Sequence, residues 1–209
     1  MGALVAGLAG CTTTQPDTSP SPTSAAPTPT PSAVPSPSPS PSPTPVPRAT
    51  LTGMTVTDPA TLTRPAVAVK VPNLKVEQPR VGLNAADIVI CQPNGDSATR
   101  LCPIFHSQYP DAVGAVRSIR PADVALLSPI FPVFANTGAA DWVMNYVKAN
   151  SEHLERMTYL DYRGTAAYSV DKSRLCKANG KTQYDRAIQA HPEEIVDDEA
   201  SVVAPWLRP

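Results

Sequence analysis

The sequence is poor in the residues from which metal and nucleophile sites are usually built. Its 209 residues include only three histidines and four cysteines. No Cys-x-x-Cys pair and no HExxH motif occurs, which argues against a zinc ribbon, a thioredoxin-type site and a metalloprotease. A G-x-S-x-G nucleophile elbow and a phosphate-cradling glycine loop are also missing. We therefore expect no metal and no cofactor.

A strong net charge and long apolar runs are missing too. The formal net charge is -1, so the bulk charge does not indicate a nucleic-acid partner or a membrane-surface role. No uninterrupted apolar stretch reaches the roughly 18–20 residues that a helix needs to span a bilayer. If a membrane holds this protein, it must hold it by another means.

Proline, in contrast, is abundant and unevenly placed. Half of the 26 prolines lie in residues 12–48, among serine, threonine and alanine. Such a segment has little apolar surface to bury, so we expect it to be a disordered, extended linker that could reach on the order of 100 Å. Residues 49–209 then leave enough chain for one compact domain and too little for two.

The first eleven residues, MGALVAGLAGC, look like the end of a secretory signal peptide. Their last four, LAGC, resemble the bacterial lipobox, which predicts that Cys11 is lipidated and becomes the first residue of a mature lipoprotein. No Lys or Arg precedes the apolar run, so we expect the true start to lie further upstream. The alternative is an unprocessed N-terminus with a chance cysteine.

The other cysteines are Cys91, Cys102 and Cys176. In an exported protein thiols tend to be oxidised. Cys91 and Cys102 flank a Pro-Asn-Gly-Asp cluster typical of a turn between two strands, and a disulfide between them would add about 2–3 kcal/mol to stability. Pairing of either one with Cys176 stays open, because sequence does not show geometry.

Short strands alternate with helices along residues 49–209, which predicts a single α/β domain with a mixed β-sheet flanked by helices. The pattern gives strands at 66–71, at 86–91 as a central strand, at 100–109, up to Ser118 and at 132–135, and helices from Pro121, over 139–157 and near the C-terminus. We expect Pro103 to mark an edge strand or a bulge. Asn136 or Thr137 is expected to cap the helix over 139–157.

Two segments are candidates for ligand binding. Arg117, Ser118 and Arg120 precede the helix that starts at Pro121, where two guanidinium groups could bind a phosphate or a carboxylate. The alternative is that these arginines pair with acids such as Asp123 or Asp111.

The second candidate is the loop of Asn136, Thr137 and Gly138, which follows a strand at the end where α/β folds usually place ligands. A plain helix cap explains this loop equally well.

A catalytic role has less support. His106 and Ser107 could form a dyad, but this needs an acid within reach, and the sequence does not demonstrate one. Asp87 and Ser118 are the other residues that an enzyme could use. We leave open whether the protein is an enzyme.

Four separated blocks resemble the YerB-type family of bacterial lipoproteins, a domain of unknown function, in its N-terminal domain. They are LTGMTVTDPATLTRPAVAVKVPN (51–73), RVGLNAADIVI (80–90), TRLCPIFHSQYPDAVGAVRSIRPADVALL (99–127) and FANTGA (134–139). The resemblance implies an exported, lipid-anchored protein with an α/β domain, and it brings no established activity. Arg117, Ser118 and Arg120 match the family's RSxRP block, Arg100 its TR pair, and residues 136–138 its strand-end loop.

The sequence also departs from the family. Cys91 stands where family members carry an acid, which puts any role of that acid in doubt here. The similarity fades beyond about residue 160, and members commonly continue into a second, smaller domain. Either this sequence is truncated or it is a one-domain member.

Together these features predict a lipoprotein on the extracytoplasmic face of the bacterial cell membrane. We expect it to bind a ligand or partner, such as a cell-wall polymer or an envelope protein, at a polar cleft of Arg100, Arg117, Arg120 and the loop 136–138. An envelope hydrolase or transferase acting on a wall component is the alternative. A purely structural protein that positions a partner is a third.

Overall fold

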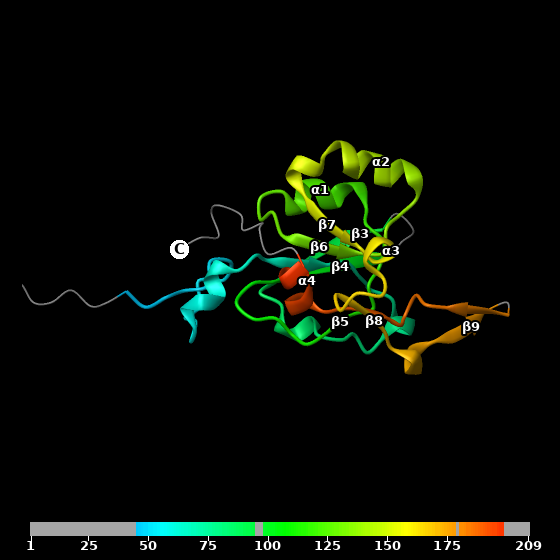
Figure 1. Ribbon diagram of the computed structural model, residues 1–209, viewed down its shortest axis with the longest axis horizontal. Helices are drawn as coiled ribbons and strands as arrows, with labels where there is room; N and C mark the ends of the chain where they lie inside the picture. Colours follow the sequence, from blue (N-terminus) through cyan, green and yellow to red (C-terminus); the bar gives the residue numbers. More distant parts are fainter. Residues whose placement is uncertain (1–44, 95–97, 179, 199–209) are drawn as a thin grey trace, which may run out of the picture. The chain divides into compact units, whose positions relative to one another are not determined.

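A mixed β-sheet runs through the computed structural model, which describes residues 45–94, 98–178 and 180–198 (Figure 1). The strands of this sheet are β1 (Val67–Val69), β2 (Val71–Pro72), β3 (Ile88–Pro93), β4 (Thr99–Phe105), β6 (Val133–Asn136) and β7 (Glu155–Thr158). Their order is β2, β4, β1, β6 and β7, with β3 on the other side of β4. β1, β6 and β7 are parallel, whereas β4 is antiparallel to its neighbours. The predicted α/β fold with a mixed sheet is confirmed.

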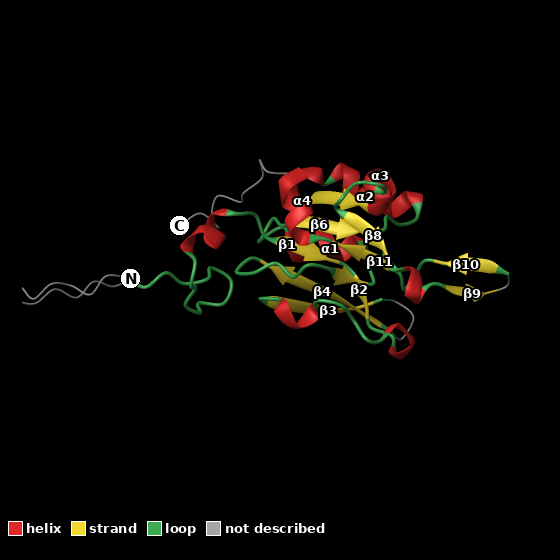
Figure 2. Cartoon of the chain, turned by 60° about the horizontal axis from the view of Figure 1, so that its bottom comes forward, coloured by secondary structure: helices red, strands yellow, loops and turns green. Residues whose placement is uncertain are grey.

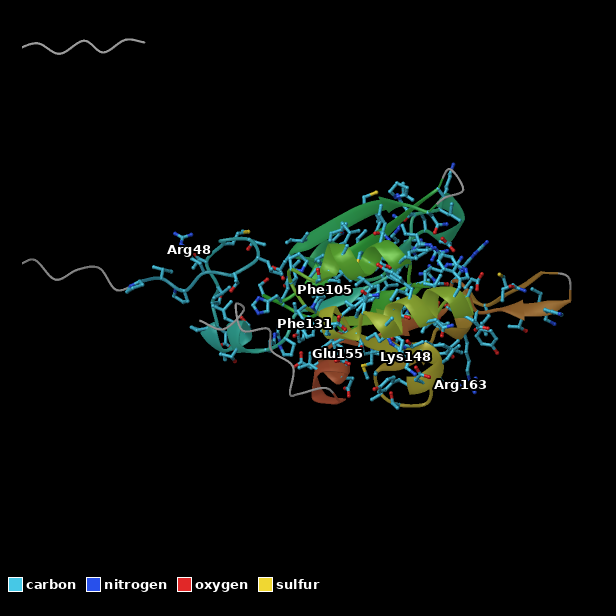
Figure 3. The ribbon with its side chains drawn as sticks, turned by 90° about the horizontal axis from the view of Figure 1, so that it is seen from above. Arg48, Phe105, Phe131, Lys148, Glu155 and Arg163 are labelled. Atoms are coloured by element: carbon cyan, nitrogen blue, oxygen red, sulfur yellow. The ribbon has the colours of Figure 1, made fainter. Side chains whose placement is uncertain are left out.

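Other elements cover both faces of the sheet, and the residues of β1 alternate between the two apolar clusters that result. Ala68 packs with α1 (Pro121–Leu127) and α2 (Asp141–Ala149), while Val67 and Val69 pack toward the opposite side. That side is covered by a small sheet of β5 (Val113–Gly114), β11 (Ile188–Ala190) and β8 (Tyr168–Val170), and by α4 (Pro192–Asp198). Figure 1 shows α1 and α2 on one face and α4, β5 and β8 on the other. In Figure 3, Phe105 lies within the domain, whereas Arg48 lies on the N-terminal segment.

The remaining elements are short. They are α3 (Tyr159–Tyr162), the hairpin β9 (Cys176–Ala178) and β10 (Lys181–Gln183), and the 3-10 helices Pro59–Thr63, Lys75–Glu77, Leu83–Ala85, Ser151–His153 and Lys172–Arg174. Figure 2 shows the β9–β10 hairpin projecting away from the main sheet. The predicted signal peptide, Cys11 and nearly all of the predicted linker lie outside the described residues. Among those that are described, no helix combines the length and apolarity that crossing a membrane requires.

Two predictions about the β3–β4 hairpin are wrong. β3 is an edge strand rather than a central one, because it pairs with β4 alone and exposes Val89. Pro103 lies in β4, which has partners on both sides. Proline is tolerated there because the ladder on the β1–β2 side passes from Ile104 to Leu101 and skips the position of Pro103, so no N–H is needed.

The helix predicted over 139–157 is also only partly correct. α2 ends at Ala149, and residues 155–158 form the parallel strand β7. The side chain of Asn150 donates to the carbonyl oxygen of Tyr146 (2.8 Å), and the backbone of Asn150 is no longer helical. Ala140, and neither Asn136 nor Thr137, is the N-cap of α2, and it makes no side-chain cap bond.

Candidate functional site

The segment Arg117–Ile119 crosses the carboxyl ends of β1 and β6. The prediction that a strand ends at Arg117–Ser118 is wrong, because the preceding strand, β5, already ends at Gly114. Three backbone hydrogen bonds hold it: from Arg117 N–H to the carbonyl of Lys70 (2.7 Å), from Thr137 N–H to the carbonyl of Arg117 (3.0 Å), and from Ile119 N–H to the carbonyl of Gly138 (3.1 Å). The carboxyl ends of parallel strands are where open α/β sheets usually bind ligands.

Arg117 projects from this segment between two carboxylates. One Nη donates to Oε1 of Glu77, and the other donates to Oδ2 of Asp185 at 2.8 Å. Glu77 is 1% exposed and ends the 3-10 helix Lys75–Glu77, while Asp185 lies at the surface. Burial opposes the charge of Arg117, but the hydrogen bonds to Asp185 and Glu77 outweigh it and raise the pKa of the guanidinium.

Arg100 reaches the same region from β4. Its Nη1 donates to the carbonyl oxygen of Ser118 at 2.6 Å, which fastens β4 to the crossing segment. Arg100 and Arg117 both line a cavity of about 180 Å³, here called the Arg100–Arg117 pocket. The other lining residues are Pro72, Asn73, Leu74, Glu77, Asn94, Ala98 and Thr99.

A second pair of opposite charges is buried beside the crossing segment. Lys70 is fully buried, and its Nζ lies 2.7 Å from Oδ1 of Asp123, which is 1% exposed. The same Oδ1 accepts from Nε2 of Gln92 (2.8 Å), and Oδ2 accepts from the backbone N–H of Arg120 (2.7 Å). We call these residues the Lys70–Asp123 cluster. The backbone carbonyl of Lys70 accepts a hydrogen bond from the N–H of Arg117. This bond joins the cluster directly to the pocket.

The predicted site residues therefore divide into two groups. The structure brings Arg100 and Arg117 together at the pocket, and the carbonyl of Ser118, which does not line it, accepts from Arg100. Arg120 does not line it, because its side chain donates to the carbonyl of Ile119 (3.0 Å) and its backbone begins α1.

The strand-end loop supports the site from one side. Asn136 is fully buried, and its Oδ1 accepts from Gly138 N–H at 2.8 Å. Gly138 has φ of 80°, a left-handed conformation that glycine adopts without strain. Thr137 contributes its backbone N–H to the crossing segment. These three residues fix the backbone next to the pocket and do not line it, and a direct role in binding stays a prediction for each of them.

The predicted pairing of the arginines with Asp123 or Asp111 occurs only in part. The backbone of Arg120, and not its guanidinium, meets Asp123. Arg117 pairs with Glu77 and Asp185 instead.

No sequence signal pointed to Glu77, which stands in an irregular polar stretch. Lys70 did carry one, because it is a lone charge inside the apolar run AVAVKV.

The residues considered for catalysis are not assembled into a triad. Oδ1 of Asp87 accepts from Ser107 Oγ (2.5 Å), and its Oδ2 accepts from the backbone N–H groups of His106 and Ser107. The ring of His106 is buried and forms no hydrogen bond to either side chain. Ser118 lies near Arg100, and six residues of β4 at about 3.3 Å each put roughly 20 Å between Arg100 and His106. The hydrolase or transferase alternative stays a prediction without supporting geometry.

The predicted disulfide is not formed, since Cys91, Cys102 and Cys176 are free. Cys91 pairs in register with Leu101, and Cys102 with Ile90, so the two cysteines lie one position out of register. Because side chains alternate between the faces of a strand, Cys91 is exposed and Cys102 is buried. Burial raises the pKa of the Cys102 thiol, against the opposing effect of Lys70. Across residues 45–94, 98–178 and 180–198, no three His, Cys, Asp or Glu side chains gather as a metal site would require.

Comparisons with known proteins place the domain among relatives of unknown function. The family described as "Protein of unknown function (DUF3048) N-terminal domain" matches residues 51–196. The chain is 34% identical over 138 residues to the "Putative lipoprotein YerB" of Bacillus subtilis (strain 168), a match that covers 66% of this chain and 40% of that protein. The crystal structure of the YerB protein from Bacillus subtilis aligns with a TM-score of 0.58 at 28% identity, over 75% of this chain and 51% of that one. The matched region thus spans only part of the length of these relatives.

Proposed function

The chain belongs to the DUF3048 family, and from that membership we propose that it is a lipid-anchored envelope protein whose domain binds an anionic group in the Arg100–Arg117 pocket. The observation that carries the binding proposal is the lining of this pocket, which combines the guanidinium groups of Arg100 and Arg117 with the carboxylate of Glu77. Guanidinium groups bind carboxylates and phosphates through paired hydrogen bonds, which makes an anionic group the favoured ligand.

The anchor is proposed from two independent features. LAGC ends in Cys11, and the prolines, serines and threonines that follow would form a tether between the membrane and the domain. The relative from Bacillus subtilis carries the name "Putative lipoprotein YerB". These features favour the extracytoplasmic face of the membrane as the location, and a cell-wall polymer or another envelope protein as the source of the anionic group.

Mass spectrometry of protein extracted from membranes tests the anchor. We expect a diacylglycerol on Cys11, and we expect a Cys11→Ala variant to appear in the soluble fraction. An unmodified Cys11 in membrane-extracted protein would overturn this part of the proposal.

Binding of the full chain to purified envelope fractions tests the pocket. We expect Arg100→Gln to weaken binding at least tenfold, and we expect added salt to weaken the wild-type binding, because ionic contacts at a partly open site are screened. Arg120→Gln is the matched control, since Arg120 belongs to the same segment but does not line the pocket. Binding that survives Arg100→Gln unchanged would rule out this site.

A further inference from the structure

A buried carboxylate oxygen in the lining of the pocket has no hydrogen-bond partner among the described residues. Glu77 is 1% exposed, and its Oε1 accepts from Arg117, but its Oε2 is buried and has no partner within residues 45–94, 98–178 and 180–198. Buried carboxylate oxygens are nearly always satisfied, and an exception calls for a physical explanation. Because Glu77 lines the pocket, a donor placed in the cavity can supply the missing hydrogen bond.

Two neighbouring polar groups in the lining are already engaged with each other. Nδ2 of Asn73 donates to Oγ1 of Thr99 at 2.6 Å, and Oδ1 of Asn73 accepts from the guanidinium of Arg80. Glu77 Oε2 is therefore an acceptor that the pocket offers to a ligand, next to the guanidinium groups of Arg100 and Arg117.

This arrangement places a positive and a negative recognition element in one small cavity. A purely anionic ligand would interact with the guanidinium groups but leave Oε2 of Glu77 unpaired, at a cost to its affinity. A ligand that carries an ammonium group beside its carboxylate satisfies both. The cavity of about 180 Å³ holds the bulk of roughly six water molecules at about 30 Å³ each, which suits a group the size of a small amino acid.

We propose that the Arg100–Arg117 pocket takes an α-amino acid group, with its carboxylate at Arg100 and Arg117 and its ammonium at Oε2 of Glu77. This inference rests on the proposed function, because it names the ligand class of the same site. The group can come as a free amino acid or on a wall-peptide side chain whose ammonium and carboxylate both lie outside the peptide bonds, and the chemistry at the pocket is the same in both cases.

Calorimetric titration of the full, detergent-solubilised chain tests the inference with four probes. Alanine carries both charged groups, propionate lacks the ammonium, ethylamine lacks the carboxylate, and a purified wall-peptide fraction carries the group on a polymer. We expect alanine to bind at least tenfold more tightly than propionate or ethylamine. Binding of the wall fraction but not of alanine would assign the group to a wall peptide, and the reverse would assign it to a free amino acid.

Glu77→Gln isolates the contribution of the ammonium contact. The amide still offers an oxygen to Arg117, but it presents a donor in place of Oε2, so we expect alanine and propionate to bind within twofold of each other. Glu193→Gln is the control, because Glu193 is an exposed acid elsewhere in the chain. If Glu77→Gln does not fold, Arg100→Gln serves instead, and it should weaken alanine and propionate alike.

The outcomes separate the inference from the proposed function. Propionate that binds as tightly as alanine, with both lost in Arg100→Gln, would overturn the amino-acid inference and leave an anion site. In that case water, and not a ligand, is the hydrogen-bond donor to Oε2 of Glu77. If none of the four probes binds and envelope binding is unchanged in Arg100→Gln, both proposals fail.

Discussion

Removing one charge from the Lys70–Asp123 cluster should destabilise the domain much more than removing both. In Asp123→Asn, the ammonium of Lys70 stays fully buried and loses the anion 2.7 Å away. In Lys70→Met, the carboxylate of Asp123 stays buried with only Gln92 and the backbone of Arg120 as donors. In the double variant neither charge remains, and the new amide can still accept from Arg120 N–H.

The magnitudes follow from the burial of both groups. Breaking a buried ion pair by removing one partner costs about 3–5 kcal/mol, whereas replacing both charges is often close to neutral. We therefore expect each single variant to lose about 3–5 kcal/mol of unfolding free energy, and the double variant to lose no more than about 2 kcal/mol. The coupling energy between the two sites should then be at least about 4 kcal/mol, above the usual range of about 0.5–3 kcal/mol for residues in contact.

Urea unfolding followed by circular dichroism measures these differences. With an m-value of about 2 kcal/mol/M, a loss of about 4 kcal/mol lowers the unfolding midpoint by about 2 M. Glu193→Gln is the control, because Glu193 pairs with Arg64 at 3.4 Å and its side chain is 67% exposed. An exposed pair contributes about 1 kcal/mol at most. Additive single effects, with a double variant as unstable as their sum, would refute the reasoning.

Two further predictions concern buried groups outside this cluster. Burial lowers the pKa of His106, against the opposing effect of Asp87, so the unfolded chain binds a proton first as the pH falls below about 6.5. The unfolding free energy should therefore fall by up to about 1.4 kcal/mol per pH unit below pH 6.5. Urea unfolding at several pH values should show a shallower slope for His106→Gln, and equal slopes would contradict the prediction. Thiol labelling followed by mass spectrometry should modify Cys91 in the native protein and Cys102 only after unfolding, because Cys102 is buried, and a bridge that protects both would contradict the free thiols of the structure.

The fold class could be predicted because the strongest local patterns agree with the tertiary structure. AVAVKV forms β1 and β2, and Pro121 begins α1 with Asp123 in its first turn. The order of the strands in the sheet was harder to predict from the sequence. Ile88–Pro93 is apolar enough for a central strand, and only the pairing with β4 alone shows that it is an edge. The helix predicted over 139–157 failed because Leu154 continues the apolar spacing although the chain has already left the helix.

Of the residues at the site, only the arginines could be predicted from the sequence. Arg100 and Arg117 stand in recognisable polar blocks, and the structure brings them to one cavity. Their partners could not be predicted, because Glu77 lies 40 positions from Arg117 and Asp185 lies in a different part of the chain. Hydrogen bonds at such separations are set by the fold and leave no local spacing to read.

The placement of the buried charges argues for a function at this edge of the sheet. Apolar residues of similar volume would stabilise the interior at least as well as the pairs Lys70–Asp123 and Arg117–Glu77. Yet both pairs lie at the carboxyl ends of β1 and β6, joined by the hydrogen bond from Arg117 N–H to the carbonyl of Lys70 (2.7 Å). Ionic groups concentrated at one place, with a carboxylate oxygen that has no partner among the described residues and lines a cavity, favour a binding site there. If the cluster exists to hold the pocket in shape, Lys70→Met/Asp123→Asn should leave the domain folded and still weaken binding at Arg100 and Arg117, a separation of stability from binding that a purely structural cluster would not produce.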